Sequence, residues 1–155
     1  MSALHRYSIS QLTSSIGSST TVHAIRIATP STRLARLVGL EVATSSVTAS
    51  DTPLDVYLLR TLSSGLTSGG SSTPIKLRPG IPASLVTGTT AMTVGSLSGG
   101  ETLFRGYVPA VSALLVHMFP PERAPELAVS DTLDLLLVAG STALTNVRST
   151  LIWEE

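Results

Sequence analysis

Histidines and carboxylates are the residues of this chain with the most scope for chemistry, and their spacing supports no particular reaction. The three histidines, His5, His23 and His117, are far apart and show no paired spacing of the HExxH kind. We therefore expect ordinary strand or surface histidines rather than metal ligands. Convergence of these residues in the folded chain is the alternative that the sequence leaves open.

Two pairs of carboxylates lie close together in the sequence. Asp51 and Asp55 flank a proline turn, and Asp131 and Asp134 open an apolar run. Paired carboxylates can do acid–base work or bind Ca²⁺, but neither spacing matches a calcium-binding loop. Asp131 follows Ser130 and is typical of a turn. A hydrolase would rest only on the presence of Ser, His and Asp somewhere in the chain, so we expect no enzyme, no catalytic residue, no metal and no cofactor.

Composition indicates a single domain that hides part of its surface. The chain has 155 residues, which suits one domain over 1–155. Only 13% of residues are charged, against a usual share of about 25%, and 43% are hydrophobic. No apolar run is long enough to span a membrane, so we expect burial in a symmetric oligomer or a larger assembly, and no membrane partner.

Charge and cysteine content exclude further classes. Ten basic residues balance ten acidic ones, which argues against a nucleic-acid partner, since binding to phosphates needs a basic patch. There are no cysteines, so disulfides and thiolate metal sites are excluded.

The elements that must position these residues are predicted to be strands. Val, Ile and Thr cluster in short runs between Gly, Pro and Ser turn signals, which predicts an all-β fold. We expect an antiparallel, jelly-roll-like β-sandwich of about eight strands with one long Ser/Gly/Pro loop. The expected strands are 6–11, 20–27, 33–44, 54–61, 85–94, 102–108, 112–119, 132–139 and 147–153.

Three of these runs carry more specific expectations. The run 33–44 is expected to place Leu34, Val38, Leu40 and Val42 on one face. The runs 112–119 and 132–139 are apolar on both faces, which predicts burial on both faces and a neighbouring subunit as the outer cover. Short helices at 108–118 and 127–138 are the alternative, because periodicity does not separate helix from strand in runs this short.

The stretch 62–82, LSSGLTSGGSSTPIKLRPGIP, is the longest segment without a regular pattern. Gly69-Gly70 and the prolines interrupt any long strand or helix, although 75–78 fits a brief strand. We expect a loop that projects from the β framework and makes a contact with a partner. The candidate contact residues here are Ser63, Gly69, Gly70, Pro74 and Pro79.

A second candidate contact segment is the densest mixture of proline and charge in the chain. Proline-rich segments are pre-extended, so that docking costs less conformational entropy. A contact arm and a rigid connector between two strands are equally good interpretations. The candidate residues are Pro120, Pro121, Glu122, Arg123 and Pro125.

The order of several short motifs resembles a family of small bacteriophage-encoded virion proteins. The motifs are Arg6-Tyr7-Ser8 and a strand ending in Arg60 before a Gly/Ser loop. Ser72-Thr73-Pro74 and Leu77-Arg78-Pro79-Gly80 follow, then the Pro-Pro-Glu segment from Pro120 to Pro125 and the closing Trp153-Glu154-Glu155. The resemblance spans nearly the whole chain, with a more apolar run around Leu114 to Met118.

The resemblance implies a jelly-roll-like virion component of the capsid decoration, or cement, type, with no catalytic residues. It implies the major capsid protein and a homotrimer as partners, and a place on the capsid surface after synthesis in the host cytoplasm. Other virion positions in the tail, neck or head fibre are the alternative. A lectin-like module is a further one, but the six scattered aromatic rings do not suggest a platform for stacking on sugars.

Overall fold

The computed structural model describes residues 4–45, 53–60, 69–92, 100–109 and 111–155, and the side chains of these residues except at 91 and 92. Within these ranges the chain forms strands and no helix. The first half contains β1 (Arg6–Ile16), β2 (Thr21–Ala28), β3 (Ala35–Ala43), β4 (Leu54–Arg60), β5 (Gly70–Ser72) and β6 (Ile75–Lys76). The second half contains β7 (Thr87–Met92), β8 (Glu101–Val108), β9 (Leu114–Met118), β10 (Glu126–Leu127), β11 (Thr132–Val138) and β12 (Leu144–Glu154).

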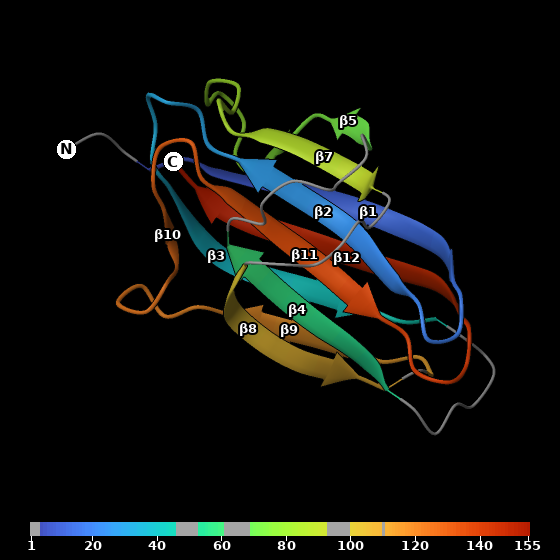
Figure 1. Cartoon of the computed structure of the whole chain (residues 1–155). Helices are drawn as coiled ribbons and strands as arrows, with labels where there is room; N and C mark the ends of the chain where they lie inside the picture. The colour runs from blue at the N-terminus through green and yellow to red at the C-terminus, as the bar shows by residue number, and fades with distance from the viewer. Residues whose placement is uncertain (1–3, 46–52, 61–68, 93–99, 110) are drawn as a thin grey trace.

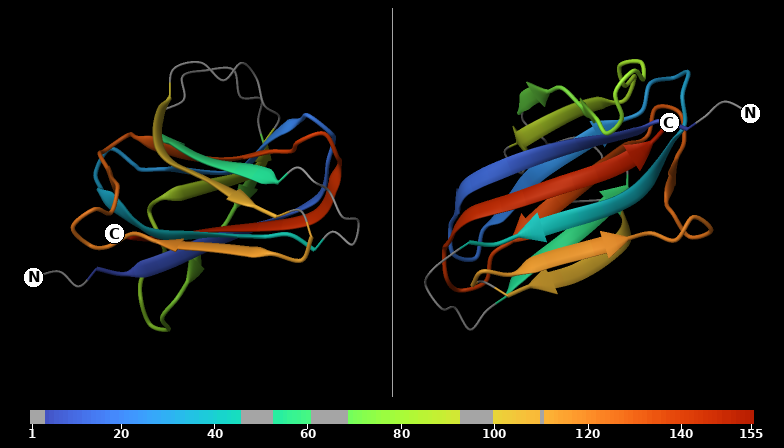
Figure 2. Two further views of the ribbon diagram at one scale, coloured as in Figure 1. Left: turned by 90° about the horizontal axis from the view of Figure 1, so that it is seen from below. Right: turned by 180° about the vertical axis from the view of Figure 1, so that it is seen from behind.

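The strands form two antiparallel sheets that pack face to face, as the two layers in Figure 2 show. Sheet A has the order β10-β3-β12-β1-β6, and β9 pairs with β3 on the same side as β10. Sheet B has the order β5-β7-β2-β11-β4-β8 and faces the viewer in Figure 1. The expected all-β antiparallel sandwich is therefore confirmed.

Eight of the twelve strands make the framework. Four neighbours in sheet A are β1-β12-β3-β9, and four in sheet B are β2-β11-β4-β8. In this order the first and last strands of the chain are neighbours, and most connections cross from one sheet to the other, which is the arrangement of a jelly roll. The other four strands, β5, β6, β7 and β10, are short or lie at the edges of the sheets. The expected number of about eight strands therefore fits the framework but is lower than the total.

The core lies between the sheets and follows the two-residue period of the strands. Leu54, Val56 and Leu58 of β4 are fully buried, as the alternation in this run predicts. On β12, Leu151 and Trp153 face the same interior, and the Trp153 ring stacks on Tyr7 of β1. The two runs for which a helix was the alternative are strands, because their partners β3, β2 and β4 supply ladders on which their backbones pair.

A register shift changes which residues of β3 face the core. The pairing of β3 with β12 slips between Ile152 and Trp153, where one extra residue of β3 is accommodated. Leu40 and Val42 are buried as expected, but Leu37 is the buried residue before the shift, Val38 is half-buried and Leu34 is exposed. The prediction that these four residues share one buried face was wrong at Leu34 and Val38. A bulge shifts the two-residue alternation by one position, and counting along the sequence takes no account of it.

The described part of the Ser/Gly/Pro stretch is not a loop that projects freely. β5 pairs with β7 at one edge of sheet B, and β6 pairs with β1 at one edge of sheet A. The chain therefore passes from one sheet to the other at a single side of the sandwich. The longest irregular part is 77–82, with Gly80 at φ 82°, a conformation that glycine adopts without strain. Residues 62–68, including Ser63, lie outside the described residues.

Candidate binding surfaces

The three histidines lie in separate places. His5 precedes β1 at one end of the sandwich, His23 is on β2 and His117 is on β9. His117 packs between Phe104 and Phe119, with ring centroids 4.4 and 4.5 Å away. Within the described ranges, no group of three or more His, Cys, Asp or Glu side chains is placed to hold a metal ion.

The structure brings together one polar cluster that the sequence does not reveal, on the outer face of sheet B. Nε2 of His23 lies 2.6 Å from Oδ1 of Asp134, and Arg26 donates from Nε and Nη2 to the two carboxylate oxygens at 2.6 and 3.0 Å. His23 and Asp134 are completely buried. Burial opposes ionisation of Asp134, but the close His23 nitrogen and the Arg26 hydrogen bonds outweigh it and hold the pKa of this carboxyl below its ordinary value.

A histidine held by an aspartate is also a component of nucleophilic catalysis, so a hydroxyl partner is the feature to look for. Among the described residues, Nδ1 of His23 has no hydrogen-bond partner, and therefore no serine or threonine there is placed as a nucleophile. Complete burial leaves the pair no access to a substrate. The cluster therefore holds β2 to β11. The only sequence signal for it is an aspartate inside the apolar run of β11.

The two candidate contact segments lie at opposite sides of the sandwich, the first at β5 and β6 and the second beside β3. Gly70 is exposed on β5 and Pro79 is exposed after β6, on the β1 side, whereas Gly69 and Pro74 are half-buried. The Pro120–Pro125 segment lies on the β3 side, where the Leu37 N–H donates to the Pro125 carbonyl at 2.9 Å. There Pro120, Pro121, Glu122 and Arg123 are exposed in a turn closed by Arg123 N–H and the Pro120 carbonyl. The fold therefore does not join the two segments into one site.

Strand β9 carries the most regular exposed apolar surface on any described strand. Leu114, Val116 and Met118 point away from the core and are 64, 49 and 49% exposed. We call these three residues the β9 patch. Among the described residues β9 pairs with β3 alone, so its other edge is unpaired. The prediction that 112–119 is buried on both faces, with a neighbouring subunit as the outer cover, stays a prediction, because no described residue of this chain covers the outer face of β9.

The strand next to the β9 patch places one charged residue beside it, since the half-buried Glu41 of β3 pairs opposite Val116. Gly39 lies opposite Met118, and a side chain at this position would meet the Met118 sulfur, so glycine lets Met118 lie across β3. Beyond β3, the outward positions of β12 are mixed and include Thr150, Ile152 and the exposed Arg148. Beneath β9, Leu115 and Phe119 pack against the core. The patch is therefore a rigid surface that a partner can cover without large rearrangement.

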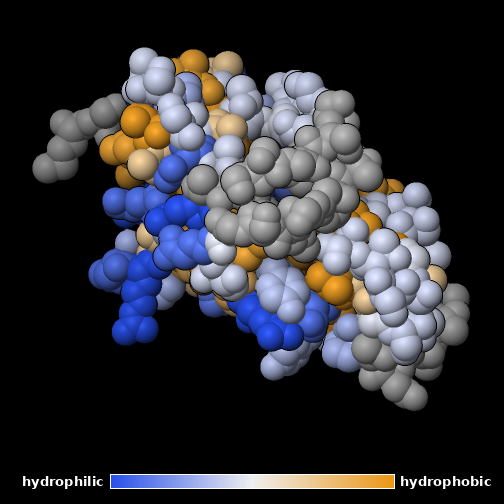
Figure 3. Space-filling model, in the orientation of Figure 1, coloured by the Kyte–Doolittle hydropathy of each residue, from blue (hydrophilic) through white to orange (hydrophobic). Residues whose placement is uncertain are grey.

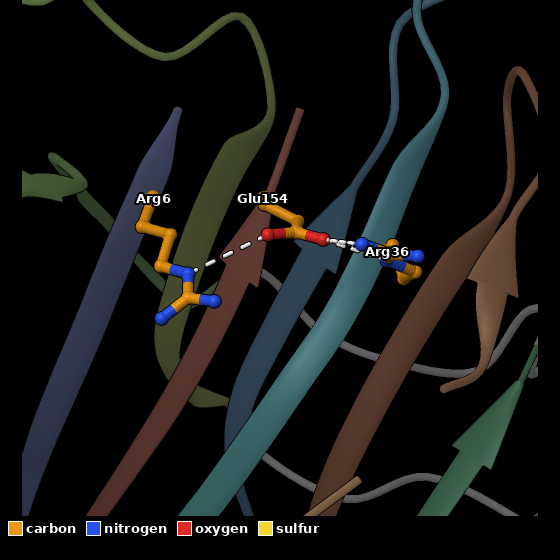
Figure 4. Close-up of polar contacts among 3 residues, drawn as sticks. All are labelled: Arg6, Arg36 and Glu154. Atoms are coloured by element: carbon orange, nitrogen blue, oxygen red, sulfur yellow. Dashed lines mark hydrogen bonds and ion pairs between the residues drawn. The ribbon is translucent and has the colours of Figure 1, made fainter. Parts of the chain in front are cut away.

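The opposite end of this face of sheet A carries an ion cluster that spans three adjacent strands, shown in Figure 4. The carboxylate of Glu154 on β12 accepts hydrogen bonds from Arg36 on β3, one of them 2.6 Å from Nε, and lies 3.5 Å from Nε of Arg6 on β1. Glu154 is nearly buried, whereas the Arg6 side chain is 61% exposed. The cluster thus links β1, β12 and β3 at the end of the sheet where β1 begins and β12 ends.

A second aromatic group lies on the outer face of sheet B. Tyr107 is 65% exposed on β8, and the Arg105 guanidinium lies over the Tyr57 ring, 5.0 Å from its centroid. Asp55 accepts hydrogen bonds from Arg105 at 3.2 Å and from the Tyr57 hydroxyl at 3.3 Å. The rings that are scattered in the sequence are therefore partly gathered, because β4 and β8 pair with Tyr57 opposite Arg105. Such a group can stack on a sugar ring.

Comparison of the chain with protein-family models, curated proteins and solved structures found no match. In the described residues there is no helix of the length and hydrophobicity that crossing a bilayer requires.

Proposed function

We propose that this protein is a structural component of a bacteriophage particle, a decoration or cement protein that binds across subunits of the capsid. The observation that carries the proposal is the β9 patch, which is a rigid apolar surface on a jelly-roll framework and is left uncovered by the chain itself. Exposed contiguous apolar surface of this kind marks interaction sites. Jelly rolls are frequent among viral shell proteins.

The mechanism is mechanical rather than chemical. Covering the patch removes apolar area from water at about 25 cal/mol per Å². A specific interface buries about 800 Å² per partner, so the three side chains of the patch form its centre and neighbouring side chains on the outer face of sheet A, including Glu41 opposite Val116, supply the remainder. A homotrimer seated in this way contributes three such surfaces, and many copies together resist the internal pressure of a filled capsid.

The experiment compares addition of purified protein to capsids that lack it. Wild-type protein is expected to bind and to raise resistance of the capsids to heat and to low salt. Val116→Glu places a charge in the centre of the patch and is expected to reduce binding at least tenfold, because a buried unpaired carboxylate is costly.

The matched control is Val129→Glu, which changes a valine of nearly equal exposure, 47%, outside the patch and is expected to bind like wild type. Equal binding by both variants would contradict the role of the β9 patch. No binding by wild-type protein would exclude the decoration role and leave another virion position, or glycan recognition through Tyr107, as the function.

A further inference from the structure

The end of the sandwich at the start of β1 and the end of β12 combines exposed leucines with basic side chains. Leu4, Leu34 and Leu77 are each half or more exposed there. Figure 3 shows apolar and hydrophilic surface side by side at this end, near the two chain termini of Figure 1. We call it the Leu/Arg end, and it is separate from the β9 patch.

Three hollows adjoin one another at the Leu/Arg end. The largest, about 400 Å³, is lined by Arg6 and Arg78 with Leu4, Leu77 and Ile81 as apolar walls. A second, about 200 Å³, shares Leu4. A third, about 130 Å³, shares His5 with the first. Reciprocal backbone hydrogen bonds between His5 and Glu155 fix the common rim. The hollows therefore follow one another along a supported surface.

The charge of this end is positive although the chain as a whole is neutral. Five basic residues gather there against three acidic ones, a net charge of +2. The basic residues are Arg6, Arg33, Arg36, Lys76 and Arg78, and the acidic residues are Glu126, Glu154 and Glu155.

Two of the three carboxylates are already engaged within the chain. Glu154 binds Arg36 and Arg6, and the Glu155 carboxylate accepts hydrogen bonds from the N–H groups of Leu85 and Val86. In contrast, Arg33, Lys76 and Arg78 have no ion-pair partner in the part of the chain that the structure describes. The free charge available to a partner is therefore basic.

From this complementarity we propose that the Leu/Arg end binds an extended acidic segment of a partner protein, with carboxylates on Arg78 and Arg33 and apolar side chains in the hollows. An extended chain advances about 3.3 Å per residue and turns alternate side chains to one side, which suits a row of small hollows. Arginine favours carboxylate partners because its planar fork binds both oxygens.

The same observations disfavour two other occupants. Nucleic acids that bind without a groove contact usually stack on exposed aromatic rings. The one Phe, Tyr or Trp ring among the described residues lining these hollows, Tyr7, is buried. A lipid surface needs no separate hollows. The proposal goes beyond the capsid role, because it holds for any partner protein that carries such a segment.

The test measures fluorescence anisotropy of labelled ten-residue peptides with the purified full chain. A peptide of alternating glutamate and leucine is expected to bind, with an affinity that falls as salt rises. A lysine–leucine peptide is expected not to bind, and a glutamate–serine peptide is expected to bind more weakly.

Two charge-reversal variants then localise the site. Arg78→Glu is expected to weaken binding of the glutamate–leucine peptide at least tenfold. Arg148→Glu changes another exposed arginine, on the far part of β12 next to Leu12, and is expected to bind like wild type. Equal affinity for the lysine–leucine peptide, or an unchanged affinity of Arg78→Glu, overturns the proposal. Binding to phosphatidylglycerol vesicles but to no peptide also overturns it and identifies a lipid surface instead. None of these results depends on capsid binding.

Discussion

At the scale of residues, the least expected feature is a completely buried charged group, Asp134, inside an apolar strand. An aspartate within the run Leu133–Leu137 lies on a strand whose two faces are buried, as predicted for 132–139, although the burial occurs within this chain and needs no neighbouring subunit. It is tolerated because His23 and Arg26 lie against it. Removing a buried carboxylate of this kind is costly mainly because its partners then stay buried without a counter-charge.

We expect Asp134→Asn to destabilise the protein by about 3 to 5 kcal/mol near neutral pH, since it leaves buried partners without their counter-charge. The pKa of Asp134 is lowered in the folded state from the ordinary value of 3.8. Its contribution to stability is therefore fully present above pH 3.8 and is lost as the pH falls through the folded-state pKa.

Urea unfolding of both proteins over a series of pH values checks this expectation. The difference in free energy of unfolding between wild type and variant should be constant above about pH 5 and should shrink toward pH 2. A difference that does not change with pH would show that Asp134 contributes through packing alone.

At the scale of elements, the short strands β5 and β6 tie the edges of the two sheets on the side of β7 and β1. The pairing of β5 with β7 depends on a close approach of their backbones at Gly88. Gly88 on β7 is buried, and a side chain at this position would meet the Ile9 side chain and, at 3.0 Å, the Ser72 carbonyl of β5. Glycine is required there because the backbone of β5 and a core side chain occupy the space of a Cβ atom.

Gly88→Val is therefore expected to separate β5 from β7 and to destabilise the fold by about 1 to 3 kcal/mol, the usual cost of overpacking. Hydrogen exchange at 70–72 should become faster, while exchange in β12 should stay slow. Gly70→Val is the matched control, because a side chain at this exposed glycine of β5 meets no neighbouring atom within 4 Å. Equal effects of the two substitutions would mean that the close approach at Gly88 is not required.

At the scale of the whole molecule, two exposed surfaces are unused by the chain, the β9 patch and the Leu/Arg end. They are separate surfaces, since β9 pairs with β3 along its own length and the Leu/Arg end surrounds the start of β1 and the end of β12. A protein with two such surfaces can join its own copies through one and a different partner through the other. This arrangement suits a component of a larger assembly.

If the β9 patch joins copies of the chain into a trimer instead of binding the capsid, light scattering should give three times the mass of 16.1 kDa. Val116→Glu should then reduce the mass to that of a monomer. This monomer should still unfold on heating in the same way as a separated wild-type chain. Val129→Glu should keep the trimer. A wild-type monomer at all concentrations would remove self-association and leave the patch for the capsid alone.

Much of the fold is predictable from local sequence patterns. Each of the nine main runs expected to be strands contains a strand in its described residues, because β-branched residues and Gly/Pro turn signals act over a few neighbouring residues. The burial of Leu54, Val56 and Leu58 follows from the two-residue period in the same way. Low charge likewise indicates in advance that part of the surface is suited to burial.

The tertiary structure alone decides which strands become neighbours, and with them every candidate surface. A bulge opposite Ile152 exchanges Leu34 for Leu37 in the core, and pairing of β2 with β11 joins His23 to Asp134 across more than a hundred residues. The histidine and carboxylate spacings, which show no site in the sequence, therefore give no hint of this contact. Register and sheet order depend on contacts distant in sequence, and a local pattern carries no information about them.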